Sequence, residues 1–327
     1  MIETIPFTTE DAWRQARALD VTSTEIAALF GCSPYLSEYE LWHRKRDKVI
    51  TELEANERMT WGLRLQDSIA AGVAQEQGWT IRRMTEYLRD PELRLGASFD
   101  FGIDWTVNAE QVVKETNGLL EVKNVDSLQF KRGWLMDKDL ETGQESIESP
   151  PHIELQAQQQ LLVSGRAFLY LGALVGGNTL HLLHRLPDPK IHAAIRAKVR
   201  AFWASIEANT PPEPDFKRDA RFIAQLYGFA EPGKVLDAMD NERLMTLMAE
   251  YQIEAGLERD AKARKDALKA EVLTMIGEAE KVYGVGWTIS AGMVGPTHVS
   301  YDRKGYRTFR PSFTKKEQVD AAPVPQG

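Results

Sequence analysis

Hydrophobic and polar residues repeat with two different periods along this chain, and the change of period separates expected helices from expected strands. Over residues 9–19 and 57–78, apolar side chains recur every three to four positions, which is typical of helices with one buried face. From residue 79 onward, short runs rich in β-branched and aromatic residues are separated by turns that contain glycine or asparagine. These runs predict strands over WTIRRM, LRLGASFDFGIDWTV and GLLEVKNV.

Further elements follow from capping and turn signals. Helices are expected over residues 25–31, from Ser37, which has capping-box spacing to Glu40, and over 150–165 and 188–208. FLYLGALVGG and TLHLLHRL predict a hairpin, whereas residues 124–150 are charged and irregular and are expected to form a surface loop. The order of helix, three strands, helix and two strands indicates an α/β (α+β) fold.

The C-terminal third has a different character. Residues 235–282 are rich in alanine, glutamate, lysine and leucine, which suggests a helical hairpin or coiled coil for interaction or oligomerisation. Two or three strands are expected over 285–313. Basic and aromatic residues interleave there, as in a nucleic-acid-binding segment or an edge strand whose aromatics face a core. We therefore expect a domain over 1–216, a helical extension over 217–284, a small basic β segment over 285–316 and a disordered tail over 317–327.

Composition and charge narrow the class of protein. The 327 residues are 43% hydrophobic and 27% charged, without a long apolar run, so we expect no membrane span and no signal peptide. Cys32 is the only cysteine, which excludes an internal disulfide and a cysteine-based zinc site and fits a reducing cytoplasm. The formal net charge of −8 argues against a protein that coats nucleic acid with its whole surface. The net charge does not exclude an enzyme with a local basic groove and an acidic metal site.

Three residues in the strand region have the chemistry of such a site. Asp100 falls in the second expected strand, and Glu121 and Lys123 fall on one face of the third. Carboxylates on two neighbouring strands provide hard oxygen ligands suited to Mg²⁺, and a lysine beside them can stabilise developing negative charge. The alternative is that all three are solvated surface charges, but an ionised group within the apolar strand LLEVKNV needs partners.

Six segments in order resemble the YqaJ-like viral recombinases, a group related to phage lambda exonuclease within the PD-(D/E)xK nucleases. They are TSTEIAALFGCSPYLSEYELWHRK, WGLRLQD, LGASFDFGI, LLEVKN, ELQAQQQLLVSG and FWASIEANTPPEPD. The resemblance spans roughly residues 10–216. It implies a restriction-endonuclease-like core in which a central mixed sheet is flanked by helices.

The resemblance also implies roles for individual residues of the metal site. Asp100 matches the metal-binding aspartate, and Glu121 and Lys123 match the E-x-K pair. The backbone carbonyl of Val122 would be a further ligand. Gln156 matches a glutamine that supports the active site from the following helix, and Mg²⁺ is the implied cofactor, with Mn²⁺ able to substitute.

A phosphate pocket is implied near the N-terminal end. Arg17 and Thr24 have the spacing of a family arginine and serine that grip the 5′-phosphate of a DNA end, and Ser23 could replace Thr24. A guanidinium fork and a hydroxyl at a helix start suit a phosphate on physical grounds too. The alternatives are a solvent-facing arginine and a plain N-cap threonine.

Gln66 marks a departure from the family pattern. The family usually has a glutamate four residues after the helix glycine, here Gly62, as a third acid of the metal site. Gln66 belongs to the apolar stripe and is expected to point inward, with Asp67 on another face. An amide brings no charge, so weaker metal binding is expected; a core amide is the alternative. Asp67 and Glu76 are possible substitutes.

The resemblance implies a Mg²⁺-dependent deoxyribonuclease that degrades one strand of linear duplex DNA from the 5′ end. The resulting 3′ single strands would serve phage or prophage recombination in a bacterial cytoplasm. A single-strand annealing protein is an implied partner, and a trimeric ring is an implied homo-oligomer. One alternative is a catalytically weak DNA-end-binding protein of the same fold. The other is a helix-turn-helix regulator, since TSTEIAALFGCS also resembles the start of that motif.

Overall fold

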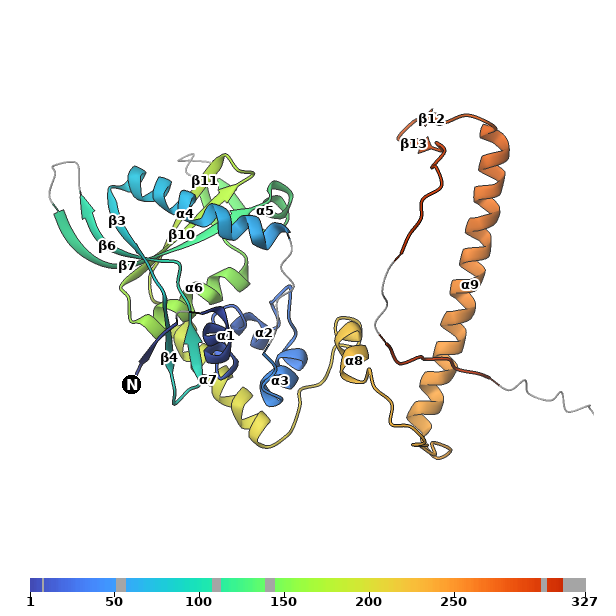
Figure 1. The fold of residues 1–327 in the computed structure, drawn as a ribbon, viewed down its shortest axis with the longest axis horizontal. Helices are drawn as coiled ribbons and strands as arrows, with labels where there is room; N and C mark the ends of the chain where they lie inside the picture. The colour runs from blue at the N-terminus through green and yellow to red at the C-terminus, as the bar shows by residue number, and fades with distance from the viewer. Residues whose placement is uncertain (8, 51–56, 108–112, 139–144, 301–304, 314–327) are drawn as a thin grey trace, which may run out of the picture. The chain divides into compact units, whose positions relative to one another are not determined.

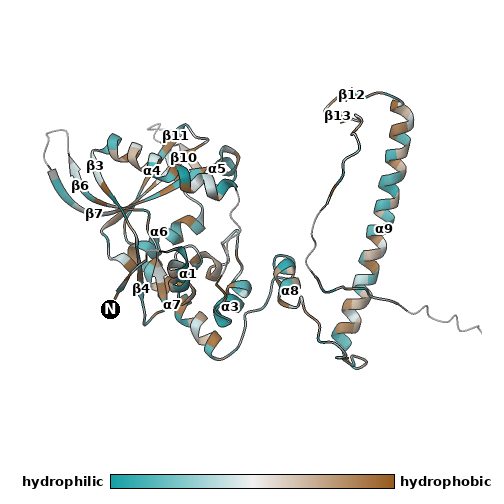
Figure 2. Cartoon of the chain, in the orientation of Figure 1, coloured by the Kyte–Doolittle hydropathy of each residue, from teal (hydrophilic) through white to brown (hydrophobic). Residues whose placement is uncertain are grey.

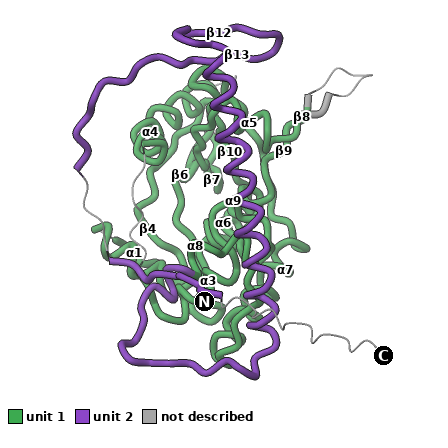
Figure 3. Tube along the Cα trace, turned by 90° about the vertical axis from the view of Figure 1, so that its right-hand side faces the viewer, with its two compact units in different colours: residues 1–223 green, residues 224–327 purple. Residues whose placement is uncertain are grey.

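The computed structural model describes residues 1–7, 9–50, 57–107, 113–138, 145–300 and 305–313. The chain divides into two compact units, Met1–Ile223 and Ala224–Gly327, which Figure 3 shows in green and purple. The first unit contains the segments that carry the expected site.

A five-stranded mixed sheet lies at the centre of the first unit (Figure 1). Its strands, in spatial order, are β11 (Thr179–Arg185), β10 (Phe168–Val175), β7 (Val113–Val125), β6 (Phe101–Val107) and β3 (Trp79–Arg83). Only β10 and β7 pair in parallel, and the other neighbours are antiparallel. The mixed α/β fold expected from the sequence is therefore confirmed.

Residues of β7 alternate between two hydrophobic cores, one on each face of the sheet. Leu120 and Val122 pack with Ile69 and Val73 of helix α4 (Glu57–Gln77). On the other face, Leu119 belongs to the larger core, to which helix α6 (Pro151–Ser164) contributes Ala157 and Leu161, among others. Figure 1 shows α4 and α6 on opposite sides of the strands. Because side chains alternate along a strand, Glu121 and Lys123 face α6.

A second sheet and four further helices belong to the first unit. The strand order is β1 (Glu3–Pro6), β4 (Glu86–Asp90), β5 (Leu95–Ala97) and β2 (Val21–Thr22). The helices are α1 (Glu10–Ala18), α2 (Ile26–Leu29), α3 (Glu38–Arg46) and α7 (Pro189–Glu207). As expected, the Ser37 hydroxyl caps α3 by accepting a hydrogen bond from the Glu40 amide.

The described residues 124–138 and 145–150 are more ordered than the charge pattern indicates. They contain helix α5 (Ser127–Gly133) and a small hairpin of β8 (Leu135–Lys138) and β9 (Glu145–Glu148). The Asp126 carboxylate caps α5 by accepting from the amides of Leu128 and Gln129. Phe130 and Trp134 are buried in the larger core, so the two apolar anchors outweigh the polar composition of this segment.

The second unit consists mainly of one long helix. The C-terminal end of helix α8 (Ala220–Leu226) forms the first residues of this unit. The long helix α9 (Glu242–Ile276) is followed by a hairpin of β12 (Lys281–Gly284) and β13 (Trp287–Ser290). The expected helical hairpin is a single helix, because Gly256 has a helical backbone and lowers only the local helix propensity. Figure 2 shows polar and apolar residues distributed along α9.

The rest of the second unit differs from the expectation in two ways. Two or three strands were expected over 285–313, but the described residues of that range contain only β13, and its partner β12 lies before residue 285. The tail over 317–327 lies outside the described residues. Within the described ranges, no helix is long and apolar enough to cross a membrane.

Candidate active site

The two expected acids are brought together by the pairing of β6 with β7. Asp100 immediately precedes β6, whose first residue Phe101 pairs with Leu120. This register carries the Asp100 carboxylate to the next strand, where its Oδ2 accepts a hydrogen bond of 2.8 Å from the Val122 amide. Asp100 therefore lies beside the segment that carries Glu121.

Lys123, Glu121 and Gln156 form a closed triangle of hydrogen bonds between β7 and α6. The Lys123 ammonium donates to Glu121 Oε1 over 2.7 Å and to Gln156 Oε1 over 3.1 Å. The Gln156 amide nitrogen in turn donates to Glu121 Oε1 over 2.6 Å. Glu121 and Gln156 are buried, whereas the Lys123 side chain is 25% exposed. The Lys123 ammonium is therefore partly accessible to solvent while its two hydrogen-bond partners are buried.

Asp100 and Glu121 lie close enough for their negative charges to repel each other. Burial and then the nearby Glu121 raise the pKa of Asp100 to about 7, against the opposing effects of Lys123, the Val122 amide and Arg83. Burial alone would lower the pKa of Lys123, but Glu121 and Asp100 outweigh it and raise that pKa. Two carboxylates therefore compete for one ammonium, and a further cation would relieve their repulsion.

The donor set fits a hard divalent cation. Carboxylate and carbonyl oxygens are the ligands that Mg²⁺ takes, usually with only one or two protein carboxylates. Within the described ranges, no group of three or more histidine, cysteine, aspartate or glutamate residues could hold a metal ion. The site thus offers Asp100 and Glu121 without a third acid.

Gln66 lies against Arg83 at the edge of the sheet. Its Oε1 accepts from Arg83 Nη2 over 3.1 Å, and Asp67 forms an ion pair with the same guanidinium. Gln66 and Asp67 were expected on different faces of the helix, and Asp67 is indeed the more exposed of the two; both nevertheless contact one guanidinium, because the long arginine side chain reaches them from β3. Gln66 is half-buried, and it is connected to the acids through Arg83, whose positive charge lowers the pKa of Asp100.

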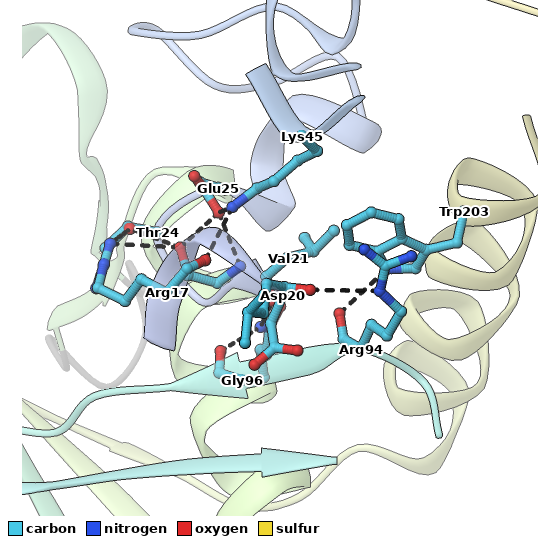
Figure 4. Close-up of polar contacts among 12 residues, drawn as sticks. Arg17, Asp20, Val21, Thr24, Glu25, Lys45, Arg94, Gly96 and Trp203 are labelled. Carbon is cyan, nitrogen blue, oxygen red and sulfur yellow. Dashed lines mark hydrogen bonds and ion pairs between the residues drawn. The ribbon is translucent and has the colours of Figure 1, made fainter. Parts of the chain in front are cut away.

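Arg17 and Thr24 lie in contact, as a shared phosphate pocket requires. Arg17 Nη2 donates to the Thr24 hydroxyl over 2.9 Å, and its guanidinium stacks on the Trp13 ring, 4.4 Å from the centroid. Figure 4 shows Arg17 and Thr24 close together, with Glu25 and Lys45 beside them. Thr24 is exposed, whereas Ser23 is buried, so Thr24 is the hydroxyl that a ligand could reach.

Lys45 and Glu25 support the pocket and were not found by sequence reasoning. The nearly buried Lys45 forms a 2.8 Å ion pair with Glu25 and donates to the Arg17 carbonyl. Burial alone would raise the pKa of Glu25, but Lys45 and then Arg17 lower it. Since Lys45 and Glu25 neutralise each other, the cluster of Arg17, Lys45 and Glu25 keeps one net positive charge. The only sequence signal was that Lys45 falls within the basic run of residues 43–48.

Gln160 also contacts Glu121. A spacing of four places Gln156 and Gln160 on one helical face. In the structure the Gln160 amide nitrogen donates to Glu121 Oε2 over 2.8 Å and to the Ser98 carbonyl over 3.0 Å.

The comparisons with known proteins agree with the resemblance. Residues 12–167 match the family described as the YqaJ-like viral recombinase domain. This matched segment includes every candidate site residue above. A search of curated proteins found no significant match.

Three solved structures are similar to the chain. LHK-Exo, an alkaline exonuclease from Laribacter hongkongensis, is 22% identical with a TM-score of 0.47, and the match covers 67% of this chain and 100% of that chain. Its complex with dAMP is 21% identical with the same coverage and TM-score. A phage related exonuclease from Haemophilus somnus 129PT is 10% identical, covering 58% and 94%, with a TM-score of 0.39.

Proposed function

We propose that this protein is a metal-dependent DNA exonuclease of phage-type recombination that degrades linear duplex DNA from the 5′ end. The observation that carries the proposal is the triangle of Lys123, Glu121 and Gln156 beside Asp100, within the segment that matches the YqaJ-like viral recombinase domain. Two acids and a lysine on adjacent strands supply what phosphodiester hydrolysis needs: cation ligands and a positive group at the reacting phosphate.

The residues divide this task among them. Asp100, Glu121 and the Val122 carbonyl would hold Mg²⁺, or Mn²⁺ in its place. When bound, the cation would polarise the scissile phosphate and favour deprotonation of the attacking water. The Lys123 ammonium, held by Glu121 and Gln156, stabilises developing negative charge and orients the water. Gln156 keeps the ammonium and the Glu121 carboxylate in one arrangement, since it bonds both.

The pocket of Arg17 and Thr24 would select the DNA end. One net positive charge and an accessible hydroxyl suit a terminal 5′-phosphate, whose second negative charge is absent from internal phosphodiesters. Generation of 3′ single strands would then follow from removal of the 5′-terminated strand. These strands would pass to an annealing protein, and a ring-shaped homo-oligomer in a bacterial cytoplasm would keep the enzyme on one duplex.

A helix-turn-helix regulator receives less support from the structure. Its recognition helix would be α3, but Tyr39, Leu41 and Trp42 of that helix are buried, as are His43 and Lys45. A recognition helix has to place its side chains in the major groove. A DNA-end-binding protein without turnover is favoured by one observation, the absence of a third acid among the described residues near Asp100 and Glu121.

Digestion of linear duplex DNA tests the proposal. We expect the wild-type protein to degrade 5′-phosphorylated duplex in Mg²⁺ or Mn²⁺ and Lys123→Ala to lose this activity by at least about 100-fold, as for removal of a preorganised charge stabiliser. Lys114→Ala is the matched control, because Lys114 is an exposed lysine of the same strand. Binding to DNA ends in Ca²⁺ without degradation in either metal would instead establish the end-binding protein.

A further inference from the structure

We propose that Gln160 is a positioning residue that sets the separation of Asp100 and Glu121 and thereby the affinity of their site for a divalent cation. This inference rests on the proposed metal-dependent function. It concerns a residue that touches neither DNA nor the reacting phosphate.

A single amide group links β7, which carries Glu121, to the segment before β6 that contains Asp100. Gln160 Nε2 donates one hydrogen bond to Glu121 Oε2 on β7, over 2.8 Å. It donates another, over 3.0 Å, to the carbonyl of Ser98, which lies two residues before Asp100. Since an amide nitrogen has two hydrogens at a fixed angle, these two acceptors hold the Glu121 carboxylate at a set position relative to the Asp100 turn.

Glu121 is consequently held at both oxygens from the same helix. Gln156 and Lys123 donate to Oε1, and Gln160 alone donates to Oε2 among the described side chains. Without the bond to Oε2, the carboxylate could rotate about its last torsion toward the Lys123 ammonium. Rotation would move an oxygen that is needed as a metal ligand, so Gln160 keeps the carboxylate available to a cation.

Burial of the Gln160 amide costs free energy, and its two hydrogen bonds offset this cost. The residue is 1% exposed, and its Oε1 is buried without a hydrogen-bond partner in the described part of the chain. The opposite amide orientation would place Oε1 against two acceptors, so the orientation is fixed by Ser98 and Glu121. What distinguishes Gln160 is that one of its two acceptors is a carboxylate of the site.

Gln159 provides a closely matched control. It is the adjacent residue of α6, it is 0% exposed, and its Oε1 is likewise buried without a partner among the described residues. Its Nε2 also donates two hydrogen bonds, to the carbonyls of Val21 and Gly96. Replacement of either glutamine therefore removes the same amide and two bonds, but only Gln160→Met releases a carboxylate of the site.

The experiment compares full-length wild type, Gln160→Met and Gln159→Met by calorimetric titration with Mn²⁺ in the absence of DNA. We expect Gln160→Met to bind Mn²⁺ about 10- to 100-fold more weakly, as for other residues that orient metal ligands. We expect Gln159→Met to bind within about twofold of wild type, the usual scatter of such measurements. Thermal unfolding reports whether each variant folds, and Gln160→Asn, which keeps an amide but is too short for both acceptors, replaces Gln160→Met if that variant does not fold.

DNA degradation as a function of Mg²⁺ concentration provides the second readout. For Gln160→Met, high Mg²⁺ should restore most of the maximal rate with an unchanged KM for DNA, which a general folding defect would not allow. Equal Mn²⁺ affinity for Gln160→Met and wild type, or equal weakening by Gln159→Met, would overturn the inference while leaving the nuclease intact. A wild type that neither binds Mn²⁺ nor degrades DNA would instead overturn the proposed function, and this inference with it.

Discussion

Substitution of Arg17 by alanine should remove the preference for a 5′-phosphorylated DNA end. Arg17 provides the one net positive charge of its cluster, since Lys45 and Glu25 form an ion pair of 2.8 Å with each other. Its guanidinium is already ordered by the Trp13 ring and by the bond to Thr24. A phosphate therefore meets a preorganised donor, and little side-chain entropy is lost on binding.

The magnitude follows from the kind of hydrogen bond lost. A hydrogen bond to a charged group contributes about 1.5–3 kcal/mol, and about 1.4 kcal/mol corresponds to tenfold in affinity. Arg17→Ala should thus reduce kcat/KM on 5′-phosphorylated duplex about 10- to 100-fold. Thr24→Ala removes a neutral hydroxyl, worth about 0.5–1.5 kcal/mol, and should cost at most about tenfold.

The assay compares initial rates on otherwise identical duplexes with a 5′-phosphate or a 5′-hydroxyl. The ratio of the two rates should fall toward one for Arg17→Ala, whereas the rate on the 5′-hydroxyl duplex should change little. Arg14→Ala is the control, because Arg14 lies on the same helix but pairs with Glu10. An unchanged ratio in Arg17→Ala, or an equal loss in Arg14→Ala, would show that Arg17 does not recognise the terminal phosphate.

Three further substitutions test the metal site, the pH dependence and the packing. Gln66→Glu should lower, by severalfold, the Mg²⁺ concentration that gives half-maximal degradation, because it adds negative charge beside Arg83, whose field reaches Asp100. His43 is buried among aromatic rings, and neither of its ring nitrogens has a hydrogen-bond partner among the residues that the structure describes; burial, then Arg46, lower its pKa below the ordinary 6.5. As the pH falls, the His43 imidazole is therefore protonated in the unfolded chain before it is protonated in the folded protein. The free energy of unfolding should consequently decrease below about pH 6.5, and this decrease should be smaller in His43→Phe. Gly96→Ala should destabilise the protein by about 1–3 kcal/mol in denaturant unfolding, since an added Cβ would lie 2.0 Å from the hydroxyl of Tyr87.

Each of these predictions has a control and an outcome that contradicts it. An unchanged or higher Mg²⁺ requirement in Gln66→Glu would show that its carboxylate serves only Arg83. For the pH dependence, His298→Phe changes an exposed histidine and should leave the slope unaltered; an equal slope in His43→Phe would refute the explanation. Gly72→Ala should stabilise by about 0.5–1 kcal/mol, because a Cβ on that helical glycine meets nothing within 4 Å. A neutral Gly96→Ala would mean that Tyr87 moves aside freely.

Much of the site could be predicted because its parts obey short-range rules. The two-residue period of a strand was enough to put Glu121 and Lys123 on one face, and the structure confirms that both face α6. The helical period likewise put Gln156 and Gln160 on one face of their helix. The prediction for Gln66 and Asp67 was incomplete, because a helical wheel does not include the reach of an arginine from another strand.

The sequence by itself determined the succession of elements, their caps and the faces that carry polar residues, since these depend on interactions within a few residues of the chain. Only the tertiary structure decided which polar residues meet. Gln160 and Glu121 are 39 positions apart, and Lys45 and the Arg17 carbonyl are 28 apart. Such contacts depend on how α6 packs on the sheet and how α3 packs on α2 and α7, and that packing follows from the burial of many apolar side chains together rather than from any local pattern.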